Sequence, residues 1–151
     1  MKPSLLISIS LAIVVAAVAA SASLAGQSSV QVLPGFRSPT GNIKCFVAGK
    51  ALYCSLGHAD YAHELQDRCM GHGNGVDWHG FRLRATKKAT VYCTSNPPYN
   101  MGTQRPSTGT LAYGKTFRHG AFKCTSRVTG VTCRNHGGHS LFVSSQAWRA
   151  T

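Results

Sequence analysis

Histidines are the side chains in this sequence best suited to proton transfer near neutral pH. There are seven, and two of them, His79 and His119, each precede a glycine near the end of an expected strand. Hydrolysis of a phosphodiester can use one histidine as general acid and another as general base. Lys115 or Lys123 would then stabilise the charge on the phosphate. A small histidine-dependent phosphodiester hydrolase is therefore one hypothesis, with His79 and His119 as its catalytic residues.

A metal centre is a weaker interpretation of the same residues. His72, His79 and Asp77 would have to meet the pair His136 and His139. Neutral imidazoles suit zinc or copper. However, glycine-rich loops hold ligands poorly, the nearby arginines repel a cation, and no His-x-x-x-His pair falls on an expected helix. We expect no metal site and no cofactor.

The charge distribution favours binding over catalysis. Lysine and arginine total 16 against four acids, for a formal net charge of +12, and all four acids lie between Asp60 and Asp77. Such a field attracts polyanions and acidic proteins. Glycoside hydrolysis is disfavoured, because it needs two carboxylates on either side of one bond. The candidate binding residues are Arg82, Arg84, Lys87, Lys88, Arg118, Lys123, Arg127 and Arg134.

We expect these residues to form a basic stripe across a sheet that binds an anionic envelope polymer or an acidic protein. Nucleic acid is another possible polyanion, and a solvated basic face with no dedicated ligand is the plainest alternative. A third hypothesis is inhibition of an extracellular enzyme. Residues 95–110 carry three prolines and no periodicity, and such a loop can insert into a partner as a wedge. The sequence does not indicate an oligomeric state.

The first 25 residues predict a secretory signal peptide. Lys2 is followed by an apolar stretch and then by small residues, which places cleavage after Ala22 or Ala25. An uncleaved membrane anchor is the alternative. The rest of the chain, residues 26–151, contains no second apolar run of spanning length. We therefore expect one disulfide-rich domain, secreted or periplasmic, with no membrane span in the mature chain.

Six cysteines follow the predicted signal peptide, and an even number in an oxidising compartment predicts three disulfides. Residues 41–56 and 120–135 share the same spacing of glycine, lysine and two cysteines. We interpret both segments as hairpins, each closed by its own disulfide. Elimination then pairs Cys69 with Cys93.

The hairpin registers follow from the turn residues. A two-residue loop at Gly49-Lys50 places Cys45 opposite Cys54, where a disulfide fits. In the second hairpin, Val128 and Thr129 make a poor two-residue loop because they are β-branched. A four-residue loop, 127–130, is expected instead, and it keeps the same register. The second disulfide would then join Cys124 and Cys133.

Short segments between glycine and proline clusters predict the remaining elements. Residues 58–69 read as a short helix with Asp60 as its N-cap. Residues 77–85, 89–93 and 140–148 read as strands. The predicted fold is mostly β, a small antiparallel barrel or sandwich with two disulfide-clamped hairpins and one short helix.

Three segments carry a resemblance to a known family: "FRSPTGNIKC" (36–45), "LAYGKTFRHGAFKCTSRVTGVTCRN" (111–135) and "GHSLFVS" (138–144). They resemble a family of small secreted bacterial proteins of unknown function, over roughly residues 34–148. The resemblance implies bacterial export and paired cysteines. It supplies no catalytic residues.

Overall fold

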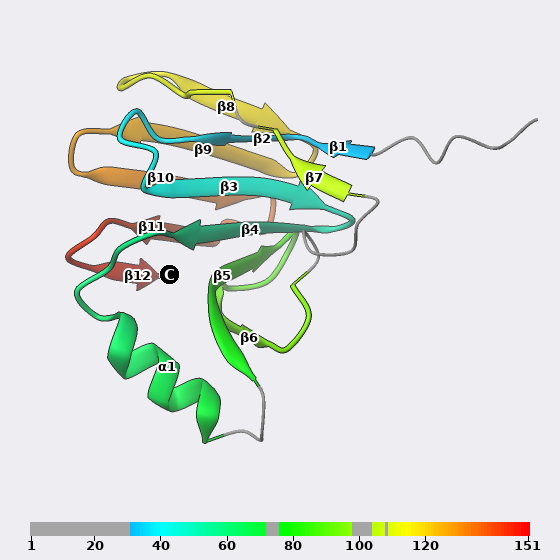
Figure 1. Ribbon diagram of the computed structural model, residues 1–151. Helices are drawn as coiled ribbons and strands as arrows, with labels where there is room; N and C mark the ends of the chain where they lie inside the picture. The colour runs from blue at the N-terminus through cyan, green and yellow to red at the C-terminus, as the bar shows by residue number, and fades with distance from the viewer. Residues whose placement is uncertain (1–30, 72–75, 98–103, 108) are drawn as a thin grey trace, which may run out of the picture.

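Two five-stranded antiparallel sheets pack face to face in the computed structural model, which describes residues 31–71, 76–97, 104–107 and 109–151 (Figure 1). The first sheet has the spatial order β2 (Gly35–Arg37), β3 (Ile43–Ala48), β4 (Ala51–Leu56), β5 (Asp77–Arg84) and β6 (Thr90–Thr94). The second has the order β12 (Trp148–Ala150), β11 (Ser140–Val143), β10 (Gly130–Asn135), β9 (Phe122–Arg127) and β8 (Thr116–His119). The mostly β prediction is confirmed, and the architecture is a sandwich, not a closed barrel.

Two further elements complete the described part of the chain. Strand β7 (Gln104–Pro106) pairs in parallel with β1 (Gln31–Leu33), so regular structure occurs within the segment 95–110. The helix α1 (Ala62–Met70) packs against β5 and β6. Within the described ranges, no helix is long and apolar enough to cross a membrane. The predicted signal peptide lies outside the described residues.

The first predicted hairpin has the expected register. Ala48 pairs with Ala51 and Cys45 with Cys54, and the disulfide closes between paired residues whose Cα atoms are 4.1 Å apart. Gly49 has a φ of 56°, the positive value that the first position of a type II′ turn requires. The alternation of side chains then points both cysteines into the sandwich, where they are buried.

The second hairpin has the predicted disulfide but a shorter loop than expected. Arg127 pairs with Gly130, which leaves only Val128 and Thr129 in the turn. Neither has a positive φ, whereas Gly130 has a φ of 140°. The glycine therefore takes the strained backbone conformation that the β-branched residues resist. The Cys124–Cys133 disulfide closes across a Cα distance of 4.0 Å.

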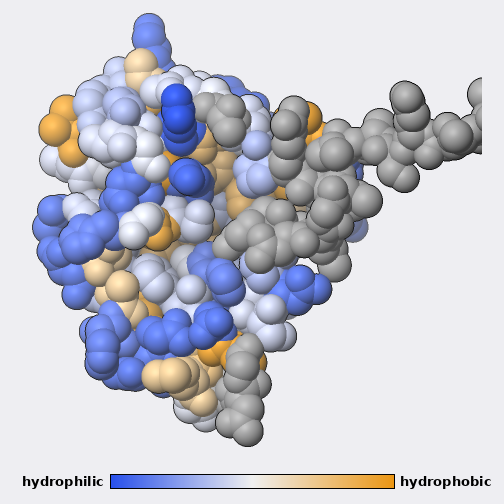
Figure 2. Space-filling view, viewed as in Figure 1, coloured by the Kyte–Doolittle hydropathy of each residue, from blue (hydrophilic) through white to orange (hydrophobic). Residues whose placement is uncertain are grey.

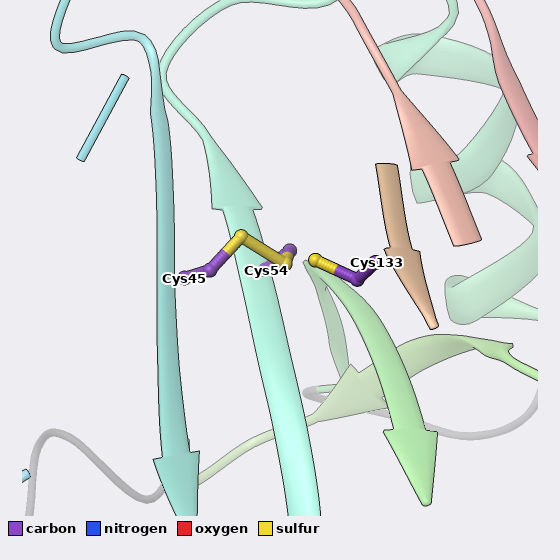
Figure 3. A group of neighbouring side chains, drawn as sticks. All are labelled: Cys45, Cys54 and Cys133. Carbon is purple, nitrogen blue, oxygen red and sulfur yellow. A yellow bond between two sulfur atoms is a disulfide. The ribbon is translucent and has the colours of Figure 1, made fainter. Parts of the chain in front are cut away.

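The Cys45–Cys54 disulfide lies beside the sulfur of Cys133, a member of the second hairpin disulfide, at the centre of the sandwich (Figure 3). These sulfurs are surrounded by apolar side chains from both sheets, and the whole cluster is shielded from solvent. Aromatic contacts close it at both edges, since Phe36 packs on Phe117 and Phe81 packs on Trp148. The largest fully buried aliphatic side chains are Leu52, Leu65, Leu83, Leu141, Val131 and Val143.

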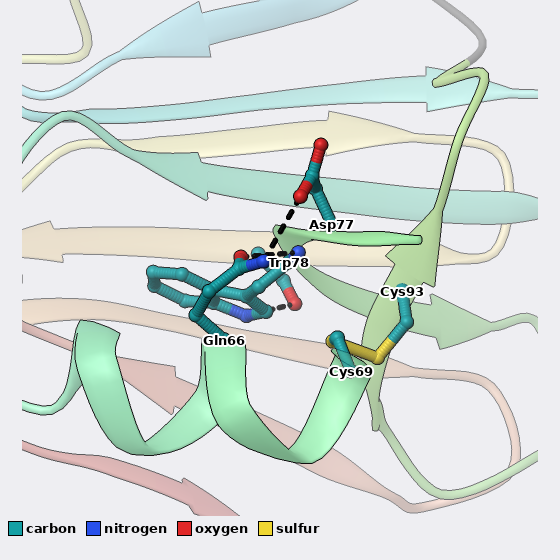
Figure 4. The surroundings of a disulfide bond; sticks show 6 residues. Gln66, Cys69, Asp77, Trp78 and Cys93 are labelled. Carbon is teal, nitrogen blue, oxygen red and sulfur yellow. Dashed lines mark hydrogen bonds between the residues drawn. A yellow bond between two sulfur atoms is a disulfide. The ribbon is translucent and has the colours of Figure 1, made fainter. Parts of the chain in front are cut away.

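The third disulfide, Cys69–Cys93, attaches α1 to the first sheet (Figure 4). Gln66 supports the same attachment, because its Nε2 donates to Asp77 Oδ1 and its Oε1 accepts from the Trp78 backbone N–H, both at 2.9 Å. The predicted N-cap at Asp60 was wrong. The helix begins after Tyr61, and no side chain caps it.

The predicted final strand, 140–148, is two strands joined by a turn. Strand β11 ends at Val143, and the Ser144 hydroxyl then accepts hydrogen bonds from the backbone N–H groups of Gln146 and Ala147. A serine that bonds to the backbone in this way competes with strand pairing. The chain reverses there and returns as β12.

Candidate functional site

Three cations stand in register across the second sheet. Arg118 of β8 pairs with Lys123 of β9, and Lys123 pairs with Arg134 of β10. All three side chains are exposed on the outer face. Since adjacent strands are about 4.8 Å apart, this cation row extends over about 10 Å.

Strand alternation produces the row. In β9, Phe122, Cys124 and Ser126 are buried, which leaves Lys123 and Arg127 on the opposite side, facing solvent. The disulfide fixes the pairing of β9 with β10, because Cys124 and Cys133 can be joined only when they lie opposite each other. The neighbouring pair in the same ladder is Lys123 and Arg134.

The row has no counter-charge. The three ion pairs of the described residues, His58–Asp60, His63–Asp67 and Arg68–Glu64, all lie on or just before α1. The fourth acid, Asp77, binds Gln66 at the start of β5. Like charges directly opposite each other destabilise a sheet. In the unbound protein, the three cations of the row therefore repel one another. A bound anion would reduce this repulsion.

Further cations share this outer face. Arg127 faces solvent on the same side of β9 as Lys123. On β12, Arg149 pairs with Phe142 of β11, and its guanidinium lies 4.6 Å from the centre of the Phe142 ring. We call the outer surface of the second sheet that carries Arg118, Lys123, Arg127, Arg134 and Arg149 the basic face. None of the four acids of the chain belongs to its strands.

The turn between β5 and β6 brings two more predicted residues to the end of this face. Asn135, at the end of β10, donates from Nδ2 to the backbone oxygens of Arg84 at 2.7 Å and of Lys87 at 2.9 Å. Lys87 and its neighbour Lys88 are exposed. A single buried amide therefore holds a basic turn of the first sheet beside the strand that carries Arg134.

Arg82 and Arg84 do not join the basic face, because they belong to the outer side of the first sheet. The guanidinium of Arg82 lies 5.3 Å from the centre of the Tyr92 ring, and Tyr92 contacts Tyr53 at 5.0 Å. Burial raises the pKa of Tyr92, while Thr94 and Arg82 act in the opposite direction. Arg82 is thus part of an aromatic packing cluster, and the eight predicted residues do not form one stripe.

The two predicted catalytic histidines are not neighbours. His79 lies in a bulge of β5, beside Gly80, whereas His119 ends β8, an edge strand of the other sheet. His136 and His139 lie in the turn between β10 and β11. His72 lies outside the described residues. His79 and His119 therefore belong to different sheets.

Only one group of described residues has the spacing of metal ligands: the sulfurs of Cys45, Cys54 and Cys133. All three are in disulfides, and a metal binds the thiolate form. The sulfur cluster is thus a structural feature of the oxidised protein.

The family model described as a family of unknown function (DUF6636) matches residues 5–149. The chain belongs to this family. Searches of curated proteins and of solved structures gave no significant match. The three disulfides of this family member are typical of an oxidising compartment and indicate an extracytoplasmic protein.

Sequence reasoning missed Arg149 and its partner Phe142. The predicted strand 140–148 contained Phe142 and ended just before Arg149. Two residues of one continuous strand region cannot pair across strands, so their contact was not expected. The available signal was the pair Ser144-Ser145, since serine favours turns through bonds to its own backbone. With the turn recognised, alternation in β11 and β12 places Phe142 and Arg149 on the outer face.

Proposed function

We propose that this protein is an exported bacterial binding protein, secreted or periplasmic, that recognises a linear polyanion through the basic face. The observation that carries the proposal is the cation row, in which three cross-strand neighbours are all positive and none has an acidic partner. A polymer of repeated anionic groups would cross β8, β9 and β10 and meet one cation at each strand.

The expected affinity is electrostatic in origin. A polyanion carries condensed counterions, and cationic side chains that neutralise its charges release them, so that affinity falls steeply with salt. Arginine adds paired donors in a planar fork that fits phosphate or carboxylate oxygens. Lys87 and Lys88 would extend the contact around the end of the sandwich. An acidic protein with a row of carboxylates would use the same contacts.

The hydrolase and inhibitor hypotheses receive less support. His79 and His119 belong to different sheets, and general acid–base catalysis needs both groups within hydrogen-bond reach of the reacting atoms. Part of the segment 95–110 that an inhibitor would insert lies outside the described residues.

The test compares two double variants of equal charge. Lys123→Ala/Arg134→Ala removes a cross-strand Lys–Arg pair from the basic face, and Arg37→Ala/Lys44→Ala removes a cross-strand pair from the first sheet. Polyphosphate and polygalacturonate are titrated into the oxidised protein by calorimetry from 50 to 300 mM salt. We expect the first variant to bind about tenfold or more weakly. The slope of its log affinity against log salt concentration should become shallower by about two.

The control variant should keep most of its affinity. Equal losses in the two variants would mean that only net charge attracts the polymer, and the basic face would not be a site. Absence of binding to either polymer at 50 mM salt would overturn the proposal.

A further inference from the structure

A cleft opens at the end of the sandwich opposite the β5–β6 turn. Three turns that are distant in sequence line it: 38–42, 127–130 and 144–146. The cleft encloses about 110 Å³, and a wider hollow of about 430 Å³ adjoins it. The two share Tyr113, Arg127, Val128 and Thr129 along their border.

The inner wall of the cleft is held by internal hydrogen bonds. Ser38 is buried, and its hydroxyl accepts from the Ile43 backbone N–H at 3.1 Å. Ser144 is also buried, and its hydroxyl accepts from the Ala147 N–H at 3.0 Å. Asn42 bonds twice to the His58 backbone, through Nδ2 and Oδ1. A wall fixed in this way keeps its shape before a ligand arrives.

The rim, in contrast, carries polar groups without partners. Within the described part of the chain, five lining side chains make no hydrogen bond: Tyr113, Arg127, Thr129, Ser145 and Gln146. No acid lines the cleft, so it does not attract a cation. Hydroxyl and amide groups both donate and accept, and the guanidinium only donates. These groups suit a ligand with many hydroxyls and an anionic group.

Apolar groups lie beside them at the mouth. Val128 is 81% exposed and Tyr113 is 42% exposed, which makes them two of the few large exposed hydrophobic residues. Figure 2 shows an apolar spot at the tip of the β9–β10 hairpin. An 81% exposed side chain adds little to the core, so folding does not require an apolar residue at position 128. The mouth presents an apolar surface next to free hydrogen-bonding groups, as ligand sites do.

We infer that the cleft binds a sugar unit of an acidic glycan. An apolar face of the sugar ring would lie on Tyr113 and Val128, and its hydroxyls would bond to the free groups of Thr129, Ser145 and Gln146. Arg127 would bind the carboxylate, and it is also part of the basic face. This inference rests on the proposed function, because it identifies the polyanion as a polysaccharide whose remaining charges lie along the cation row.

A nucleic acid is the less favoured occupant. A base would stack on Tyr113 equally well, but hydroxyl groups that can both donate and accept match sugar hydroxyls better than the fixed pattern of a base edge. The disulfides indicate an oxidising compartment. Envelope glycans are exposed in such a compartment, which also favours a glycan over a nucleic acid.

The test uses two polymers that share charge and differ in sugar content, polygalacturonate and polyphosphate. In the oxidised protein, Tyr113→Ala and Val128→Ser should weaken polygalacturonate binding about tenfold and polyphosphate binding less than twofold. Val32→Ser is the matched control, because Val32 is 51% exposed and lies outside the cleft. It should change neither affinity. Equal weakening of both polymers, or tighter Tyr113-dependent binding of a single-stranded oligonucleotide, would overturn the glycan assignment.

The two proposals fail in different ways. If Lys123→Ala/Arg134→Ala has no effect while Tyr113→Ala abolishes polygalacturonate binding, the cation row fails and the cleft stands. If neither polymer binds, the galacturonate monomer is titrated by NMR at millimolar concentration. Shifts confined to residues 113 and 127–130 support the cleft, and unchanged spectra overturn it.

Discussion

Cys45 and Cys133 belong to different sheets, yet their Sγ atoms lie within 4.8 Å of each other. Cys54, the disulfide partner of Cys45, is in the same group. The Cys45–Cys54 disulfide and one sulfur of the second hairpin disulfide therefore lie side by side in the core (Figure 3). Thiol–disulfide exchange needs a thiolate beside a disulfide sulfur, and Cys133 supplies one to the Cys45–Cys54 bridge once it loses its partner Cys124.

We expect Cys124→Ser to change the disulfide pattern. The freed Cys133 thiolate would attack Cys45 or Cys54, form a new S–S bond between the sheets, and release the other sulfur as a thiolate, with no change in oxidation state overall. Mass spectrometry of unreduced peptides after incubation at pH 8 should find a Cys133 crosslink to Cys45 or Cys54.

The matched control is Cys133→Ser, which frees Cys124. Because Cys124 is not in the group of three neighbouring sulfurs, this variant should keep the Cys45–Cys54 bridge. The same pattern of exchange in both variants would show that the thiols react after unfolding, not across the core.

The cation row should lower the stability of the free protein. Lys123 lies between Arg118 and Arg134, and like charges opposite each other in a sheet cost about 0.2–1 kcal/mol. Lys123→Thr should therefore raise the free energy of unfolding in urea at 10 mM salt by about that amount. Salt screens exposed charges, so the gain should shrink at 500 mM salt. A loss of stability at low salt would contradict the argument that the row is uncompensated.

Much of the fold could be predicted because its constraints are local. Gly49 selects the first turn, and two cysteines nine residues apart then set the register of the hairpin and the faces of its side chains. The turn at Ser144 was missed because a run of small and polar residues fits a strand end and a turn equally well. The cleft could not be predicted, since it depends on the packing of two sheets, which brings Asn42, Tyr113 and Gln146 together.

The basic face was predicted only in part for the same reason. Lys123, Arg127 and Arg134 were among the predicted binding residues, but nothing in the sequence assigns a strand to one of two sheets. Arg82 was therefore predicted to join the same stripe, although it lies on the first sheet. The contact that does join the sheets there, from Asn135 to the Arg84 and Lys87 carbonyls, is a long-range bond to the backbone that leaves no local pattern.

Tyr61 should make the protein sensitive to alkali. Its hydroxyl donates to the Ser144 carbonyl at 2.9 Å, and burial, with a smaller effect of Asp60, raises its pKa from 10.0 to about 12. Since the folded state holds this proton more tightly, the stabilising effect is complete below pH 10 and is lost as the pH rises through 12. Unfolding in urea from pH 8 to pH 12 measures the loss.

Tyr61→Phe should cost about 1 kcal/mol at pH 8, the usual value of one hydrogen bond. Its stability should then fall less steeply with pH than that of the unchanged protein. Tyr113→Phe, which removes a tyrosine hydroxyl at the surface, is the matched control. An unchanged profile for Tyr61→Phe would mean that another group controls the alkaline transition.

The segregation of charge also gives the molecule a direction. The four acids lie on or near α1 and the start of β5, where hydrophilic residues gather in Figure 2, and the cation row lies on β8, β9 and β10 of the other sheet. Cations also occur on the first sheet, so the region around α1 differs from the rest of the molecule in carrying all the acids. The field of an anionic surface would turn this region away before contact, so that bound molecules would display the same helix to the surrounding medium.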